Sequence, residues 1–212
     1  MKKEDIFKIG YPAKVAHQPF WEYVSRHAQP QDRILDVGGG EGSHSLKLQN
    51  MGFKMVCVDI NPDYIKMSQK KGVESYVMDA TALDYADNSF DIVLLFEVLE
   101  HVKNFEDILK EAKRVAKKYV IITVPNSGDF KELGPYLTYD HFLAMDHVNF
   151  FSENDLENVL SKYFRKFKIE KGEPIVRIVG APKFFSYILM GLYKLKLFRS
   201  KSYYRLYAVA EV

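Results

Sequence analysis

The 212-residue chain has one cysteine, Cys57, and no long uninterrupted hydrophobic run. A single cysteine excludes an intramolecular disulfide and is typical of a protein from a reducing compartment. The first ten residues, MKKEDIFKIG, lack the apolar stretch of a secretory signal peptide. The most apolar segment, FFSYILMGLYKLKLF (184–198), is interrupted by two lysines and is shorter than the roughly 20 residues that cross a bilayer. We therefore expect a cytoplasmic protein without a transmembrane segment.

Charge is nearly balanced overall, with a net value of +2, but it is unevenly distributed. Residues 174–210 contain seven basic side chains and no acidic one. Proteins that neutralise a nucleic-acid backbone usually present a broad basic face, which this composition does not favour. With 47% hydrophobic and 27% charged residues, the chain has the composition of a globular protein, and its length suits one domain.

Apolar segments typical of strands alternate with helical patterns along the chain, which indicates a sheet of parallel strands wrapped by helices. The strands are expected at 33–37, 54–60, 75–80, 90–96, 119–125, 166–172 and 203–212, and the helices at 43–51, 62–71, 105–117 and 152–163. Ser152 and Asp155 have the spacing of a capping box at the start of the last helix. A further helical pattern over 12–28 is broken at Pro19.

We divide the single domain, 1–212, into an N-terminal helical cap (1–30), a core (31–172), an inserted basic and aromatic segment (173–202) and a final strand (203–212). Within the insert, a helical stripe is expected, with Lys194 and Lys201 elsewhere on the circumference. The stripe consists of Phe185, Ile188, Leu189, Leu192 and Leu195. It suits a lid over the active site, a dimer contact, or binding to an anionic membrane surface or a lipid-linked substrate.

The glycine-rich stretch ILDVGGGEGSHS (34–45) follows the first expected strand and opens a helix. Such a turn lets backbone N–H groups approach a ligand at the helix N-terminus. The stretch lacks the Gly-Lys pair of a phosphate-binding loop, and serine occupies the last glycine position of a dinucleotide fingerprint. What remains is the pattern D-x-G-x-G-x-G, filled by Asp36, Gly38, Gly40 and Gly42.

This pattern resembles motif I of the class I S-adenosylmethionine-dependent methyltransferases of the type 11 kind. The likeness continues through Asp59 at the end of the second strand, Asp79 after the third, and FDIVLLFEVLEHV (90–102) along the fourth. The resemblance implies an α/β, Rossmann-like fold with a seven-stranded, mostly parallel sheet, helices on both faces and an antiparallel last strand. It also implies S-adenosyl-L-methionine as the cofactor. The cofactor-binding residues would be Asp36, Val37, Gly38, Gly39, Gly40, Gly42, Asp59, Ile60, Asp79, Ala80, Glu97 and Val98.

In this family the acidic residues have distinct expected roles. Asp36 would help to orient the ammonium group of the ligand, Asp59 would bind the ribose hydroxyls, and Asp79 would face the adenine amino group. If the methyl acceptor is a hydroxyl or an amine, a base helps to remove its proton, and histidine suits that task near neutral pH. We expect His101, His147 and His141 to be catalytic. His17 could cover the cofactor, and His27 and His44 are expected on the surface.

The sequence EVLEH places Glu97, Glu100 and His101 on one face of a helical turn. With His147 they resemble the metal-binding set of the small-RNA 3′-terminal 2′-O-methyltransferases, and less closely that of the ubiquinone O-methyltransferases. In metal-independent relatives, however, an acid and a histidine here stabilise the loop by hydrogen bonds, and we expect no metal.

The predicted function is methyl transfer to O or N of a small-molecule acceptor by a monomer or homodimer. The alternatives are a metal-assisted RNA 2′-O-methyltransferase and a non-catalytic S-adenosylmethionine-binding protein.

Overall fold

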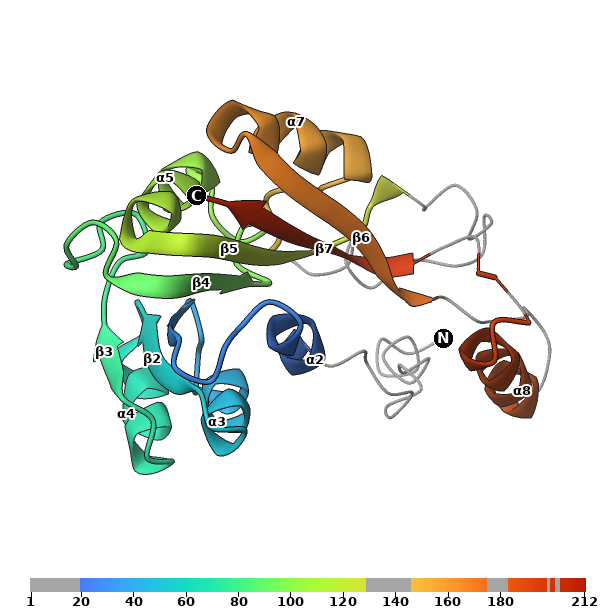
Figure 1. Cartoon of the computed structure of the whole chain (residues 1–212), viewed down its shortest axis with the longest axis horizontal. Coiled ribbons are helices and arrows are strands. Elements are labelled where there is room, and N and C mark those ends of the chain that lie inside the picture. Colours follow the sequence, from blue (N-terminus) through green and yellow to red (C-terminus); the bar gives the residue numbers. More distant parts are fainter. Residues whose placement is uncertain (1–19, 129–145, 175–182, 198, 201–202) are drawn as a thin grey trace, which may run out of the picture.

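The apolar segments of the sequence form the strands of one seven-stranded sheet with the order β3-β2-β1-β4-β5-β7-β6 (Figure 1). The structure, a computed structural model, describes residues 20–128, 146–174, 183–197, 199–200 and 203–212. The strands are β1 (Arg33–Val37), β2 (Lys54–Asp59), β3 (Ser75–Val77), β4 (Phe90–Phe96), β5 (Ala116–Pro125), β6 (Lys166–Pro174) and β7 (Tyr203–Glu211).

Strands β1 to β5 pair in parallel, whereas β7 runs antiparallel to both β5 and β6. The predicted fold class is therefore confirmed, including the antiparallel last strand. All five parallel strands end at the same edge of the sheet, and the order of the strands reverses between β1 and β4. In open α/β sheets, ligands bind outside the carboxyl ends of the strands at such a switch point.

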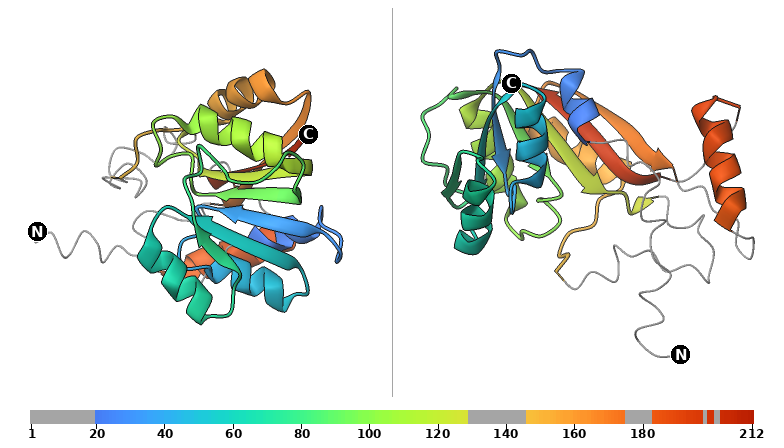
Figure 2. Two further views of the ribbon diagram at one scale, coloured as in Figure 1. Left: turned by 90° about the vertical axis from the view of Figure 1, so that its left-hand side faces the viewer. Right: turned by 90° about the horizontal axis from the view of Figure 1, so that it is seen from below.

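Helices cover both faces of the sheet (Figures 1 and 2). They are α2 (Phe20–Ser25), α3 (Ser43–Asn50), α4 (Pro62–Lys70), α5 (Phe105–Val115) and α7 (Glu153–Tyr163). A further helix, α8 (Lys183–Lys194), lies beyond the edge of the sheet and covers neither face. Because side chains alternate along a strand, neighbours in β1 belong to different cores: Ile34 packs with α2 and α3, and Leu35 packs with α5 and α7. Both side chains are fully buried, which stabilises the fold by about 1.5 to 3 kcal/mol each.

Several element boundaries differ from the prediction, and the largest differences are at β3 and at the junction of α5 and β5. Strand β3 ends at Val77 because Asp79 turns the chain, accepting hydrogen bonds from the backbone and hydroxyl groups of Thr81. Helix α5 ends at Val115 and β5 begins at the next residue, so the strand starts three residues earlier than expected. The capping box at Ser152 and Asp155 is present as predicted.

The predicted N-terminal helix is described only from Phe20, where α2 begins; its first part lies outside the described residues. No helix in the described ranges combines the length and the hydropathy that crossing a bilayer requires. Tyr23 and Val24 of α2 are buried against the sheet.

Candidate active site at the carboxyl edge of the sheet

The glycine loop between β1 and α3 depends on left-handed backbone conformations. Gly38, Gly40 and Gly42 have φ values of 69°, 55° and 74°, which side chains with a Cβ rarely adopt. Two of them are also packed closely: a Cβ on Gly38 would lie 2.7 Å from Val98, and one on Gly42 would overlap the hydroxyl of Ser68. Around Gly40, by contrast, a Cβ would meet no atom within 4 Å. The loop therefore leaves room for a ligand at Gly40.

Asp36 lies beneath this loop and helps to hold it in place. Its carboxylate is almost completely buried and accepts a hydrogen bond of 2.6 Å from the Ser45 hydroxyl at the start of α3. Burial raises the pKa of Asp36 to about 6, and the negative charge of Asp59 also raises it. The structure thus gives Asp36 a contact that shapes the loop, while its expected contact with a ligand ammonium group stays a prediction.

Asp59 ends β2 beside the loop and remains half-buried. Its Oδ2 accepts a hydrogen bond of 2.9 Å from the Gly40 N–H, and its Oδ1 accepts one of 2.8 Å from the Asn61 N–H. Each carboxylate oxygen can accept more than one hydrogen bond, so both retain capacity for hydroxyl groups. The next residue, Ile60, exposes 69% of its surface and offers an apolar contact at the same edge.

Asp79 lies close to Asp59 because the N–H of Met78 donates to the backbone carbonyl of Asp59. The Asp79 side chain is exposed, and both Thr81 donors bind its Oδ1 at 2.8 Å. These hydrogen bonds, the one from the Thr81 backbone first, lower the pKa of Asp79 and keep it ionised. Ala80 is half-buried beside it.

The prediction that Glu97, Glu100 and His101 share one helical face is wrong. Residues 97–101 form a bend and a turn, and Glu97 has a φ of 54°. Its Oε2 is 3.0 Å from Nε of Arg205 in β7, and its Oε1 accepts a hydrogen bond of 3.1 Å from the Thr123 hydroxyl. The Glu97 carboxylate is therefore bound to side chains of β5 and β7.

Arg205 was not predicted as a site residue, because it belongs to a stretch of basic residues without nearby acids in the chain. In the fold it is largely buried and pairs with both Glu97 and Glu173. The Tyr207 hydroxyl also donates to Glu173 at 2.8 Å. These contacts join β4, β6 and β7 at the edge of the sheet.

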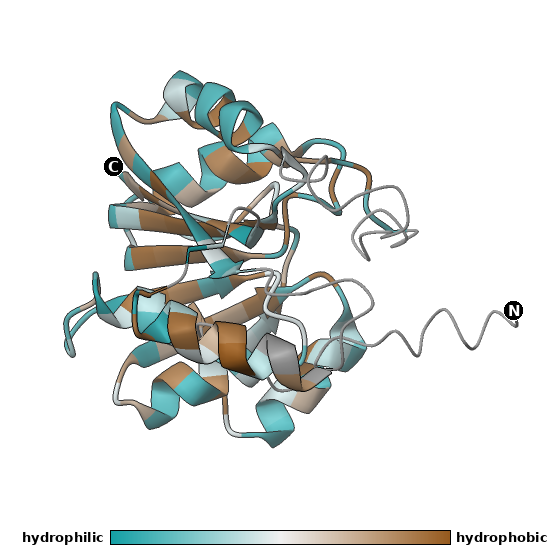
Figure 3. Ribbon diagram, turned by 90° about the vertical axis from the view of Figure 1, so that its right-hand side faces the viewer, coloured by the Kyte–Doolittle hydropathy of each residue, from teal (hydrophilic) through white to brown (hydrophobic). Residues whose placement is uncertain are grey.

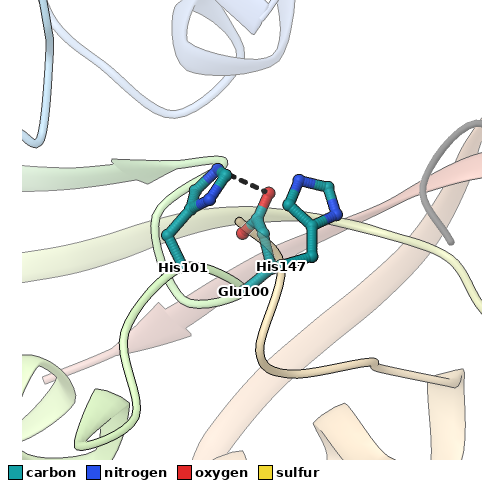
Figure 4. A group of neighbouring side chains, drawn as sticks. All are labelled: Glu100, His101 and His147. Atoms are coloured by element: carbon teal, nitrogen blue, oxygen red, sulfur yellow. Dashed lines mark ion pairs between the residues drawn. The ribbon is translucent and has the colours of Figure 1, made fainter. Parts of the chain in front are cut away.

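Glu100, His101 and His147 do come together, and Figure 4 shows their side chains grouped above the end of β4. Nε2 of His101 lies 4.0 Å from Oε1 of Glu100, and the two imidazole rings are 4.7 Å apart, edge to face. The backbone N–H groups of Val148 and Asn149 donate to the Glu100 carbonyl at 2.8 and 3.1 Å. Segments almost 50 residues apart are thereby fixed beside each other.

The Glu100 carboxylate is completely buried, and neither oxygen has a hydrogen-bond partner among the described residues. Burial, and secondarily the charge of Glu97, raise the pKa of this carboxyl to about 8. Glu100, His101 and His147 offer three ligand atoms within 4.8 Å of one another. Such a set can hold a divalent cation with positions left for water. Glu97, the fourth residue of the set that resembles the metal site of the small-RNA methyltransferases, is absent from this group.

The other histidines lie in different surroundings. His17 and His141 fall outside the described residues. His27 and His44, expected on the surface, are both half-buried. The His44 ring packs 4.7 Å from Phe20 and 5.8 Å from Phe96, and burial lowers its pKa. His44 therefore contributes to the packing of α2 on the sheet.

The strand order and the glycine loop define a class of fold that solved structures share. A methyltransferase from Archaeoglobus fulgidus superposes with a TM-score of 0.65 at 20% identity, covering 93% of this chain and 95% of that chain. One from Thermotoga maritima, described as a possible histamine N-methyltransferase, gives a TM-score of 0.65 at 19% identity, covering 92% and 89%. The chain therefore has the fold of S-adenosylmethionine-dependent methyltransferases.

Sequence comparison finds a similarity to methyltransferases over the first part of the sheet. A family model described as a methyltransferase domain matches residues 35–124, the segment from β1 to β5 that carries the site. The demethylmenaquinone methyltransferase of Renibacterium salmoninarum is 35% identical over 111 residues, 49% of this chain and 47% of that protein. The ubiquinone biosynthesis O-methyltransferase of Xanthomonas axonopodis pv. citri is 31% identical over 105 residues, 45% and 44%. The chain spans about half the length of the curated relatives it matches. Residues 35–124 are therefore similar to a methyltransferase domain.

Proposed function

We propose that the protein binds S-adenosyl-L-methionine and transfers its methyl group to an oxygen or nitrogen atom of a small-molecule acceptor. The observation that carries this proposal is the open space at Gly40, where a left-handed backbone lies next to the half-buried carboxylate of Asp59. The same segment, 35–124, matches the methyltransferase domain. When bound, S-adenosylmethionine would supply a methyl group already activated by a positively charged sulfur.

Each residue of the edge would then have a distinct binding role. The backbone from Gly38 to Gly40 would approach the amino-acid part of the ligand, and Asp59 would accept hydrogen bonds from the ribose hydroxyls. Ile60 is exposed enough to cover an apolar ring, and Asp79 stays ionised to accept from an amino group. Val37, Gly39, Gly42, Ala80, Glu97 and Val98 complete the proposed set, with Val98 and Gly42 acting through loop packing.

On the acceptor side, we assign the base to His101, supported by His147. His101 is the more exposed of the two, and its ring lies beside the buried carboxyl of Glu100. Its Nδ1 is 3.4 Å from the Asp146 carboxylate, which favours a tautomer with the proton on Nδ1 and leaves Nε2 to accept one. We propose that protein groups remove the acceptor proton without a metal, since Glu97 is withheld from the cluster by Arg205.

Substituting His101→Ala is expected to lower kcat about a hundredfold, the lower range for general-base catalysis, because the methyl donor is already activated. The affinity for S-adenosylmethionine should change little. The measurement is steady-state turnover beside a binding titration. His27→Ala is the control, because His27 is half-buried and packs near Tyr119 rather than in the Glu100 cluster. Activity that vanishes with EDTA and returns with manganese would contradict the metal-free route.

The names of the relatives, a demethylmenaquinone methyltransferase and a ubiquinone biosynthesis O-methyltransferase, suggest a quinone or a quinone precursor as the acceptor class. The test is to supply isotopically labelled S-adenosylmethionine with a panel of quinone precursors, small amines and short RNA. Label recovered in a small molecule supports the proposal. Label recovered only in RNA would favour an RNA 2′-O-methyltransferase, and cofactor binding without transfer to any member would favour a non-catalytic binding protein.

A further inference from the structure

Helix α8 stands apart from the rest of the described structure, beyond the edge where the parallel strands end (Figures 1 and 2). Among the described elements, none packs extensively against it. In Figure 3, α8 lies nearest the viewer and is coloured as hydrophobic over much of its length. An apolar helix in this position has a surface whose function the methyl-transfer site does not explain.

The exposed side of α8 is apolar. Phe184, Tyr187, Ile188 and Leu195 follow the spacing i, i+3, i+4 and i+11, which places them on one face of a helix. Between 48% and 69% of each residue is exposed. Leu189, Met190, Leu192 and Tyr193, on the remaining circumference, are half-buried. The predicted stripe is thus corrected: Ile188 and Leu195 belong to the exposed face, whereas Leu189 and Leu192 do not.

The C-terminal end of α8 adds a basic border to this face. The helix closes with Lys196 at a φ of 59°, and the Leu197 N–H donates to the Leu192 carbonyl at 2.9 Å. Leu197, 74% exposed, extends the apolar surface. Lys194, Lys196 and Arg199 are exposed beside it, and residues 174–210 contain no acidic residue.

We infer that the exposed face of α8 binds the surface of an anionic lipid bilayer. Such a bilayer has acyl chains that can bury the apolar residues. It also has negatively charged headgroups in the same plane that attract the lysines and the arginine. A second copy of the chain fits less well, because it would bring two basic borders together. The inference does not depend on the proposed methyl transfer.

The test is sedimentation of the full chain with vesicles of phosphatidylcholine, with and without about one third phosphatidylglycerol. We expect binding to the anionic vesicles alone, and weakening at high salt. Ile188→Glu with Leu195→Glu, and separately Lys194→Gln with Lys196→Gln, should each reduce binding at least about tenfold. The matched controls lie on α4: Met67→Glu, where Met67 is 44% exposed, and Lys66→Gln with Lys70→Gln should change binding less than about twofold. Circular dichroism checks that each variant is folded.

Four results would overturn the inference. The first is a failure of the wild-type protein to sediment with anionic vesicles at low salt. The second is equal binding to neutral and anionic vesicles. The third is an effect of the α4 variants as large as that of the α8 variants. The fourth is a dimer that the Ile188→Glu and Leu195→Glu substitutions dissociate, because the face would then be covered by a second copy.

Discussion

Replacing Gly40 with leucine is expected to abolish detectable binding of S-adenosylmethionine. The wild-type loop leaves open space where the Cβ would be, and the leucine side chain would fill the volume that the ligand requires. The backbone N–H of residue 40 also donates a hydrogen bond to Asp59. A change in the backbone conformation of residue 40 would therefore displace the carboxylate that is assigned to the ribose. Isothermal titration of the variant and the wild type measures the effect.

Gly72→Leu is the matched control. Gly72 also has a positive φ, 84°, and also has no atom within 4 Å of the Cβ position, but it follows α4 and precedes β3, away from the carboxyl edge. Both substitutions impose a similar backbone strain of about 1 to 2 kcal/mol. If Gly40→Leu binds the ligand as tightly as Gly72→Leu does, the loop is not the binding site.

The second large effect concerns the buried carboxyl of Glu100. Its pKa is raised from an ordinary value of 4.5 to about 8, so the folded protein binds this proton more tightly than the unfolded chain. The free energy that this bound proton contributes to folding is fully present below about pH 4.5 and is lost as the pH rises through 8. Above that pH the cost of ionising Glu100 is on the order of 4 kcal/mol.

Glu100→Gln removes the ionisable group and should therefore unfold at a higher temperature than the wild type above pH 8, by roughly 10 °C, with little difference at pH 5. Thermal unfolding across this pH range measures it. Glu106→Gln is the control with the opposite pH dependence. Hydrogen bonds from Lys162 and Tyr163 lower the pKa of Glu106, so its ionised carboxylate stabilises the fold at neutral pH. The substitution should therefore lower the unfolding temperature slightly at neutral pH. Parallel curves for wild type and Glu100→Gln would contradict a buried, proton-binding Glu100.

Local patterns in the sequence were sufficient for the fold. Buried strands such as β1 and β4 are short continuous apolar runs, and the glycine loop between β1 and α3 has a spacing that excludes phosphate-binding and dinucleotide-binding loops. Asp59 was found because acids that bind ribose lie at the end of the second strand. These features depend on residues close together in the chain.

Contacts between residues that lie far apart in the chain could not be predicted from such local patterns. Glu97 was expected beside Glu100, but Arg205, more than 100 residues later, turns its carboxylate toward β7. Arg205 lies in the basic stretch 174–210 of the sequence, and only the fold brings Glu97 and Glu173 beside it. The stripe on α8 was misplaced because apolar residues occupy almost the whole circumference, so periodicity alone does not decide which side faces solvent.

The central claim is that the backbone at Gly40 and the carboxylate of Asp59 form a binding site for S-adenosylmethionine. The most direct test is isothermal titration of the purified wild-type protein with S-adenosylhomocysteine, the demethylated product, which binds without being consumed. Saturable binding of one ligand per chain, lost in Gly40→Leu and retained in Gly72→Leu, is the predicted result. Absence of any heat with both the product and the methyl donor would contradict the account.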